Sequence, residues 1–123
     1  MQLMPAPAAV IAEAARLLRP GGIFAFTTWC LSEPWRNRAV IPDYRPLLEE
    51  QGFTVLSYSE PNGWRERQLC VYRLTRERRS ELEAEVGTSV ANLLVAEAEA
   101  APEALAKSAR VIAVARLRTN TTA

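Results

Sequence analysis

Apolar residues near the start of the chain recur with the spacing of one helix face, at i, i+1, i+4, i+7 and i+8. This periodicity predicts an amphipathic helix over residues 7–18 that packs by its apolar stripe. The stripe consists of Val10, Ile11, Ala14, Leu17 and Leu18. The helix should end at the Pro-Gly-Gly turn of residues 20–22, because proline interrupts a helix and glycine accepts the positive φ of a sharp turn.

Residues 23–29 form a run of aromatic, small and β-branched residues without clean alternation of apolar and polar positions. Such a run predicts a strand that is covered on both faces, as strands of parallel sheets are. A helix, a Gly-Gly turn and this strand correspond to the second half of a βαβ unit. The expected fold class is therefore α/β.

A loop, a short helix and a second strand are predicted next. Prolines and scattered charges surround Trp35 across residues 30–42, which favours a loop. Asp43 can cap a short helix that ends before Gly52. The alternation over residues 53–59 predicts another strand, so the order to this point is helix, strand, helix, strand.

The chain becomes strongly charged after residue 63. Residues 64–86 favour a helix, but residues 68–74 also fit a strand, and the pattern leaves both structures open. Gly87 is expected to end this element.

The last third of the chain predicts helix and then strand. Ser89 can cap a helix, and Pro102 is expected to separate it from a short helical piece near Lys107. Residues 109–118 form a β-branched apolar run flanked by arginines, which predicts the final strand. Residues 119–123 are expected to be a frayed tail.

Composition and charge limit the partners that the chain can have. The 123 residues are 49% hydrophobic and carry a net charge of +1, with acids and bases interspersed. This is typical of one soluble globular domain without a field that attracts nucleic acid or a membrane. The longest nearly uncharged apolar stretch, residues 23–31, is shorter than the roughly 20 residues of a membrane-spanning helix. The N-terminus has no basic leader, so we predict a cytoplasmic protein.

The cysteines and the absence of histidine exclude several chemistries. The chain has two cysteines, Cys30 and Cys70, and no histidine. A Ser-His-Asp triad and a histidine metal site are therefore excluded, and two lone thiols cannot form a four-ligand zinc site, so no metal is expected. We interpret both cysteines as small buried thiols without a redox or nucleophilic role.

Residues 13–22, with the sequence EAARLLRPGG, lead directly into the strand of residues 23–29. This segment resembles the helix-L-x-P-G-G-strand signature after the fourth strand of class I S-adenosylmethionine-dependent methyltransferases, of the type 11-like kind. The segment QGF at residues 51–53 and the closing RVIAVAR match the family in the same order. The resemblance covers residues 4 to 117.

The resemblance implies a partial Rossmann-like sheet that contains the last three strands of the family fold. Its final strand, residues 109–118, would lie antiparallel between the other two. Residues 1–118 would be the C-terminal portion of the methyltransferase domain, with inserted cap helices at about residues 64–107. The parent enzyme would transfer a methyl group from S-adenosylmethionine to a small-molecule acceptor.

The resemblance also implies that the cofactor-binding half is missing. Family members hold the cofactor through a glycine-rich turn after the first strand and through acids near the ribose and the adenine, but this chain begins where the fourth strand ends. Gly21 and Gly22 follow a helix and precede a strand, the reverse of the order that aims backbone N–H groups at a ligand. We expect no cofactor-binding residue in this chain and no activity of the chain by itself.

Ligands of open α/β sheets lie beyond the carboxyl ends of the strands, which places Thr28, Trp29, Cys30 and the Trp35 loop on the reactive side. The candidate acceptor-binding residues are Trp29, Trp35, Trp64 and Arg65. Their rings can stack on a planar acceptor or a cationic group, and the guanidinium can pair with an acid. Packing in the core is the commoner role of tryptophan, and that alternative stays open. No catalytic residue is assigned.

The missing half would also remove one sheet neighbour of the strand at residues 23–29. Its open apolar edge predicts that the isolated polypeptide is poorly soluble or oligomeric, and that its partners are a complementing N-terminal half or further copies of itself.

Alternative functions stay open. One is that the chain is one half of a split methyltransferase, and another is that it is a non-catalytic interaction module that binds a protein through this edge and the charged helices. A small α/β domain unrelated to methyltransferases is a third.

Overall fold

The structure is a computed structural model that describes residues 1, 4–31 and 41–119. The chain divides into two compact units. The sheet unit comprises residues 1–61 and 108–123, and the helical unit comprises residues 62–107. Each unit is described by itself.

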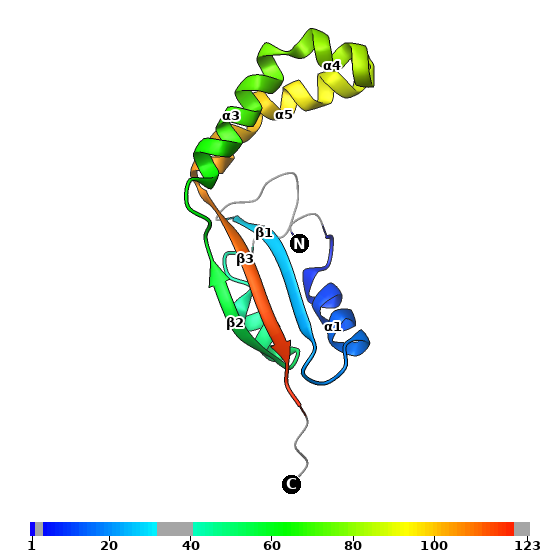
Figure 1. Cartoon of the computed structure of the whole chain (residues 1–123), viewed down its shortest axis with the longest axis vertical. Helices are drawn as coiled ribbons and strands as arrows, with labels where there is room; N and C mark the ends of the chain where they lie inside the picture. The colour runs from blue at the N-terminus through cyan, green and yellow to red at the C-terminus, as the bar shows by residue number, and fades with distance from the viewer. Residues whose placement is uncertain (2–3, 32–40, 120–123) are drawn as a thin grey trace. The chain divides into compact units, whose positions relative to one another are not determined.

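The sheet unit is built on three strands, drawn in Figure 1. They are β1 (Ile23–Leu31), β2 (Phe53–Ser59) and β3 (Ser108–Leu117), in the order β1-β3-β2. β3 is antiparallel to both neighbours, which confirms the expected position of the final strand. β1 continues past the predicted end at Trp29, because Cys30 and Leu31 pair with Ala109 and Ser108. Cys30 and Leu31 were expected in a loop and belong to β1 instead, and residues 32–40 of that expected loop lie outside the described residues.

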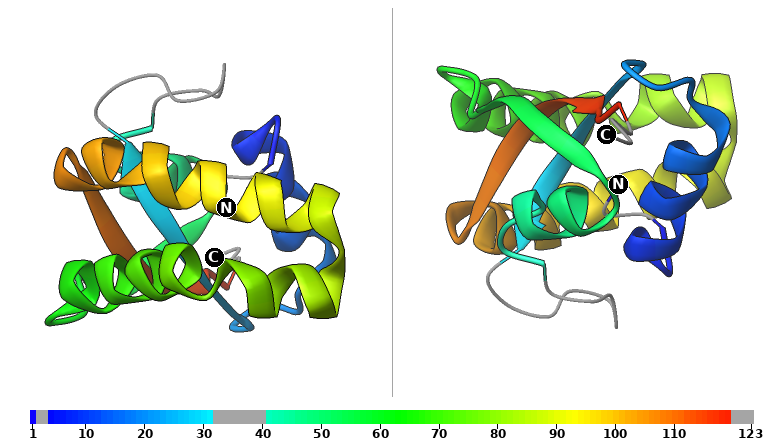
Figure 2. Two further views of the ribbon diagram at one scale, coloured as in Figure 1. Left: turned by 90° about the horizontal axis from the view of Figure 1, so that it is seen from above. Right: turned by 90° about the horizontal axis from the view of Figure 1, so that it is seen from below.

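Two helices, α1 (Pro7–Leu17) and α2 (Arg45–Glu50), lie on the same face of this sheet (Figure 2). The buried core between helices and sheet consists of Ile11, Cys30, Tyr44, Leu48, Phe53, Val111 and Ala115. The predicted stripe of α1 is shifted, because Ala14, Ala15 and Leu18 pack against this core while Leu17 is 67% exposed. The apolar face of α1 is thus centred between Ile11 and Leu18.

The opposite face of the sheet is mixed in polarity and exposes several large apolar side chains. Side chains alternate between the two faces of a strand, so neighbours of the core residues point away from the helices. Ile23, Leu56 and Ile112 lie on this open face and are 46%, 48% and 39% exposed. β1, which was expected to be covered on both faces, is therefore covered by the helices on one face only.

The Pro-Gly-Gly turn joins α1 to the sheet and ties both to the end of β3. Gly21 has φ 81°, a conformation that favours glycine, and its N–H donates to the Leu117 carbonyl at 2.8 Å. A Cβ on Gly22 would lie 2.9 Å from the Arg19 carbonyl oxygen, so no larger residue fits there without movement. The turn thus requires both glycines for backbone geometry.

The helical unit contains α3 (Trp64–Glu77), α4 (Arg79–Val86) and α5 (Thr88–Ala106). The strand alternative for residues 68–74 is wrong, because this segment lies within α3. The long helix predicted for residues 64–86 is interrupted at Arg78, where φ is −104° and ψ is 31°. Gly87 ends α4 with a positive φ of 83°, as the pattern indicated.

The expected break at Pro102 is also wrong, because α5 runs through this residue to Ala106. Proline has no N–H to donate to the carbonyl four residues earlier, so the Ala98 carbonyl loses its helix partner. Arg76 of α3 donates from Nη1 to the Ala98 oxygen at 3.1 Å and replaces that hydrogen bond.

In the described ranges, no helix is both long and apolar enough to cross a membrane.

Candidate functional site

The carboxyl ends of β1 and β2 meet at one edge of the sheet, because both strands are antiparallel to β3 and therefore parallel to each other. Cys30 in β1 and Tyr58 in β2 lie near these ends. Both side chains point to the face of the sheet that carries α2. The residues just before α2, Asp43 and Tyr44, lie next to them. We call Cys30, Asp43, Tyr44, Arg45 and Tyr58 the Tyr58 cluster.

The Tyr58 hydroxyl is the centre of this cluster. The Tyr44 backbone N–H donates to it at 3.0 Å, and the Cys30 sulfur lies 3.3 Å from it. The Arg45 guanidinium lies 4.8 Å from the centre of the Tyr58 ring, in cation-π range. The cluster therefore fixes the start of α2 to the carboxyl edge of the sheet.

Asp43 holds Arg45 over this ring. Its carboxylate accepts the Arg45 backbone N–H at 3.0 Å and the guanidinium Nη2 at 2.8 Å. The prediction that Asp43 caps α2 is wrong in position, because Tyr44 occupies the N-cap and makes no side-chain cap hydrogen bond. Asp43 lies two residues before the helix and instead binds the first helical residue, Arg45. The hydrogen bond from Arg45 keeps the pKa of Asp43 below its usual range, so the carboxylate is ionised at neutral pH.

The remaining groups of the cluster are neutral. Burial raises the pKa values of the Cys30 thiol and of the Tyr44 and Tyr58 hydroxyls, because the charged forms are poorly solvated there. A protonated thiol and protonated phenols supply neither a nucleophile nor a general base at neutral pH. The Tyr58 cluster can hydrogen-bond and position groups, but it is a poor proton acceptor.

The two cysteines differ in access, which corrects the interpretation that both are buried. Cys30 is 6% exposed, whereas Cys70 is exposed on α3. We predict that iodoacetamide modifies Cys70 alone in the folded chain at neutral pH, and both thiols after denaturation, since only an accessible thiolate reacts. Mass spectrometry of the peptides measures this, and rapid modification of Cys30 in the folded chain would contradict the packing of the cluster.

The four candidate acceptor-binding residues fall in different parts of the chain. Trp29 is 8% exposed and pairs with Arg110 in the β1–β3 register. Trp35 lies outside the described residues. Trp64 and Arg65 begin α3 in the helical unit, where the guanidinium lies 4.8 Å from the Trp64 ring centre. Arg65 also donates from Nε to the Leu105 carbonyl at 3.4 Å.

The structure therefore brings together Trp64 and Arg65, which are adjacent in sequence. Tyr44 and Tyr58 were not among the predicted site residues. Tyr58 could have been found from its position near the end of a predicted strand, because that rule had already selected Cys30. Tyr44 had no comparable signal.

Sequence comparison alone identifies no relative. No protein-family model matches the chain, and no curated protein matches it. Solved structures do match. A protein from Galdieria sulphuraria assigned as a sarcosine dimethylglycine methyltransferase matches with a TM-score of 0.73 and 18% identity, over 94% of this chain and 48% of that one.

A phosphoethanolamine N-methyltransferase of Haemonchus contortus, solved with phosphomonomethylethanolamine and S-adenosylhomocysteine, has a TM-score of 0.74 and 13% identity, over 96% of this chain and 31% of that one. The [4+2]-cyclase SpnF has a TM-score of 0.68 and 20% identity, over 97% of this chain and 48% of that one.

The chain has the fold of the C-terminal half of a class I methyltransferase. It spans between about a third and a half of the length of these solved structures.

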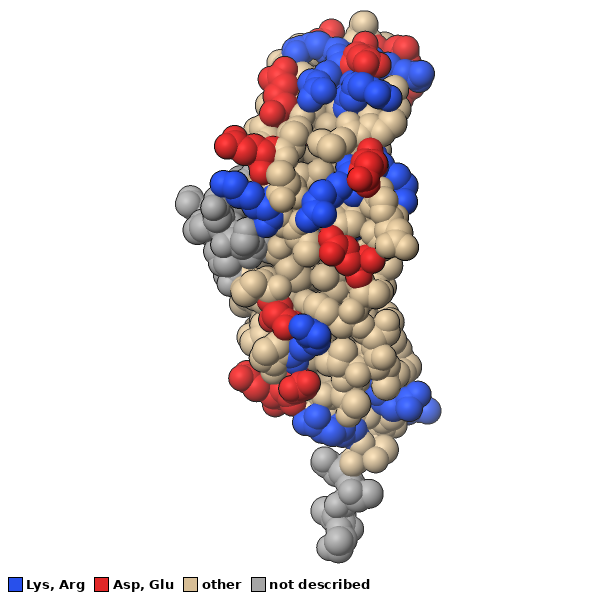
Figure 3. All heavy atoms as spheres, turned by 90° about the vertical axis from the view of Figure 1, so that its left-hand side faces the viewer, with Lys and Arg blue, Asp and Glu red and all other residues tan. Residues whose placement is uncertain are grey.

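The two glycines of the Pro-Gly-Gly turn direct their amides at the chain itself. The Gly21 N–H donates to the Leu117 carbonyl and the Gly22 N–H to the Arg19 carbonyl, both at 2.8 Å, so neither amide is directed at a ligand. Within the described ranges, no group of three or more cysteines or acids could hold a metal ion. The face drawn in Figure 3 carries both signs of charge, interspersed on each unit.

Proposed function

We propose that this chain is the C-terminal half of an S-adenosylmethionine-dependent methyltransferase that acts on a small-molecule acceptor. In this proposal an N-terminal α/β half binds the cofactor and pairs with β1, and the chain is inactive by itself. The observation that carries the proposal is the open edge of β1, next to a sheet face that exposes several large apolar side chains. The fold of the solved neighbours supports it.

The edge of β1 has the backbone groups that a further strand needs. β1 is one of the two outer strands of the sheet: it pairs with β3 on one side, and no strand of the described residues pairs with its other side. The Met1 ammonium donates to the Thr27 carbonyl at 3.2 Å, so this carbonyl faces away from β3. In an antiparallel pair, the N–H and C=O groups of successive residues point alternately toward and away from the partner strand. The backbone groups of Ile23 and Ala25 therefore point away from β3, as those of Thr27 do.

A strand bound at this edge would be accompanied by helices over the open face. Ile23, Leu56 and Ile112 expose large apolar side chains there, which is unfavourable in water and favourable under a helix. In α/β folds, helices cover both faces of the sheet. One α/β half would thus satisfy both the backbone edge and the apolar face.

The acceptor-binding residues stay a proposal. We infer that Trp29, Trp35, Trp64 and Arg65 contact the acceptor by ring stacking and charge pairing. The Tyr58 cluster gives no strong base, so the contribution of this half would be to position the acceptor. The acceptor itself does not follow from the fold, since a methyltransferase and a cyclase share it.

A non-catalytic interaction module is the second candidate function. It is favoured by exposed apolar side chains in the helical unit, among them Leu93 at 72% exposure. A complex of this chain with a separately encoded protein, without methyl transfer by that complex, would favour this candidate.

Methyl transfer from radiolabelled S-adenosylmethionine tests the proposed enzyme. The chain is assayed alone and together with any α/β half that is encoded upstream of Met1 or by a neighbouring gene, against a panel of small amines, acids and phenols. We expect labelled product only from the combination. Product formed by this chain alone would contradict the proposal, and so would a stable combination that binds the cofactor but methylates nothing in the panel or in a cell extract.

A further inference from the structure

A β-bulge in β2 decides which of its side chains face α1 and α2. The register of β2 with β3 shifts between Val55 and Ser57, so Leu56 is the extra residue of the bulge. Strict alternation from the buried Phe53 would place Tyr58 on the open face of the sheet. Instead Tyr58 packs against the core, because a bulge re-aims the side chains that follow it. The bulge thus directs the Tyr58 hydroxyl into the Tyr58 cluster.

The Tyr58 hydroxyl joins the carboxyl end of β1 to the residues before α2. It accepts the Tyr44 backbone N–H at 3.0 Å and lies 3.3 Å from the Cys30 sulfur. Tyr44 and Cys30 are buried, and a buried N–H that loses its acceptor destabilises the fold. The Tyr44 ring also meets Phe26 of β1 edge-on, with 5.7 Å between ring centres. The cluster therefore holds β1 at Phe26 and at Cys30.

Trp29 lies between these two attachment points. It precedes Cys30 in β1, and its side chain is on the opposite face of the sheet, because side chains alternate along a strand. Trp29 pairs with Arg110 of β3, and Cys30 pairs with Ala109. Since Trp29 and Cys30 share one peptide bond, a displacement of the Cys30 backbone also displaces the Trp29 ring.

We propose that Tyr58 is a positioning residue of the acceptor site, which holds Trp29 in place through Cys30. The inference rests on the proposed function, in which Trp29 contacts the acceptor. Tyr58 itself does not exchange a proton in this role. Burial raises the pKa of its hydroxyl, so the hydroxyl stays protonated and keeps its hydrogen bonds at neutral pH.

Fluorine NMR of the chain labelled with 5-fluorotryptophan measures the surroundings of Trp29. Its resonance is identified by its loss in Trp29→Phe. Tyr58→Phe removes only the hydroxyl, and we expect the Trp29 resonance to shift or broaden. Cys30→Ala should have the same effect, whereas Cys30→Ser keeps a hydrogen-bonding group next to Tyr58 and should give the native resonance. All samples carry Ala25→Lys, which reduces association through the β1 edge.

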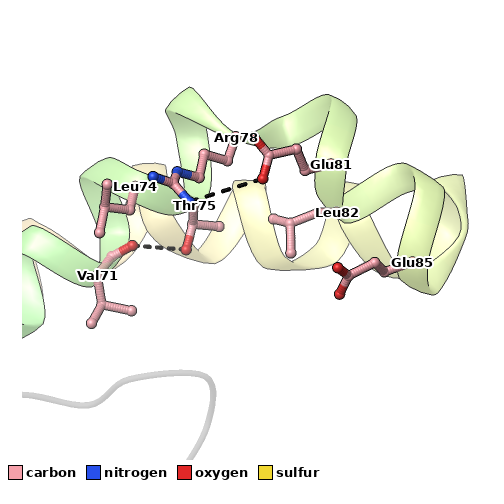
Figure 4. A pocket seen from close by; sticks show the side chains of 7 residues that line it. All are labelled: Val71, Leu74, Thr75, Arg78, Glu81, Leu82 and Glu85. Atoms are coloured by element: carbon pink, nitrogen blue, oxygen red, sulfur yellow. Dashed lines mark hydrogen bonds and ion pairs between the residues drawn. The ribbon is translucent and has the colours of Figure 1, made fainter.

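Two other hydroxyl removals are matched controls. Ser57→Ala acts in the same strand at an exposed residue. Thr75→Val acts in the helical unit, where the Thr75 hydroxyl donates to the Val71 carbonyl at 2.8 Å in a surface groove (Figure 4). Neither control should change the Trp29 resonance. Circular dichroism checks that each variant is folded, and the two Cys30 variants decide the question if Tyr58→Phe does not fold.

Steady-state kinetics gives a second readout, measured on the chain combined with its α/β half and with the acceptor that the methyl-transfer assay identifies. We expect Tyr58→Phe to lower kcat/KM for the acceptor by about tenfold or more, because alignment of the acceptor is lost. The KM for S-adenosylmethionine should not change, since the other half binds the cofactor.

An unchanged Trp29 resonance in folded Tyr58→Phe and Cys30→Ala would overturn the proposal. So would a Cys30→Ser variant that behaves like Cys30→Ala, or a native kcat/KM for the acceptor in Tyr58→Phe. A combination that methylates nothing would contradict the proposed function, and the NMR result would still decide whether Tyr58 holds Trp29.

Discussion

Phe53→Ala is expected to lower the free energy of unfolding of the sheet unit by about 3–5 kcal/mol, the usual cost of removing a buried phenylalanine. Phe53 opens β2, is 0% exposed and lies 5.7 Å from the Phe24 ring, measured between centroids. It belongs to the core that joins α1 and α2 to all three strands. A loss of this size approaches the total stability of a small domain, so much of the variant should be unfolded.

Urea denaturation followed by circular dichroism measures the change. Leu56→Ala is the matched control, because it removes a large side chain from the same strand but on the open face, where Leu56 is 48% exposed. We expect the control to lose at most about 1 kcal/mol of unfolding free energy. The half-exposed Leu56 buries less apolar area than Phe53, so its truncation removes less hydrophobic stabilisation. Equal losses for both variants would contradict the assignment of the two faces.

Ala25→Lys is expected to reduce self-association of the isolated chain, which we expect to be oligomeric or poorly soluble through the open edge of β1. Ala25 lies in the middle of that strand and is exposed, and a lysine on an edge strand opposes pairing with another strand. The concentration at which the chain associates should rise by about tenfold or more, equivalent to about 1.4 kcal/mol.

Size-exclusion chromatography over a range of concentrations shows this shift. Ala9→Lys is the control, because it places the same charge at an exposed alanine of α1. A native chain that elutes as a monodisperse monomer and unfolds cooperatively would contradict the open edge as a source of association. An Ala9→Lys variant that behaves like Ala25→Lys would show that net charge alone is responsible.

Local sequence signals were sufficient for most of the fold. The Pro-Gly-Gly turn and the apolar run after it located α1 and β1, and Gly52-Phe53 located the start of β2. The antiparallel position of β3 was implied by the resemblance to methyltransferases and is confirmed by its register with both neighbours. The turn and the starts of the first two strands depend on residues that are close together in the sequence, whereas the position of β3 was available only from the family resemblance.

The errors occurred where a distant contact overrides a local preference. Pro102 would end a helix by itself, but Arg76, which is 26 residues earlier by number, supplies the hydrogen bond that the Ala98 carbonyl has lost. The helix can therefore continue. No pattern within α5 contains this information.

The candidate site was harder to predict for the same reason. Cys30 and Tyr58 are 28 positions apart in the sequence, and only the strand order brings their side chains within 3.3 Å. The rule that ligands bind at the carboxyl ends of strands selected Cys30 and Trp29, but it does not rank the residues of the neighbouring strand. The tryptophans were chosen by residue type, which does not separate packing from binding.

Calorimetric titration of S-adenosylmethionine is the most direct test that this chain is the half without the cofactor site. The titration is made into the isolated chain and into the chain in complex with its α/β half. We predict binding only to the complex, because the Gly21 and Gly22 amides of this chain donate to its own carbonyls. Micromolar binding of S-adenosylmethionine by the isolated, folded chain would contradict the central claim.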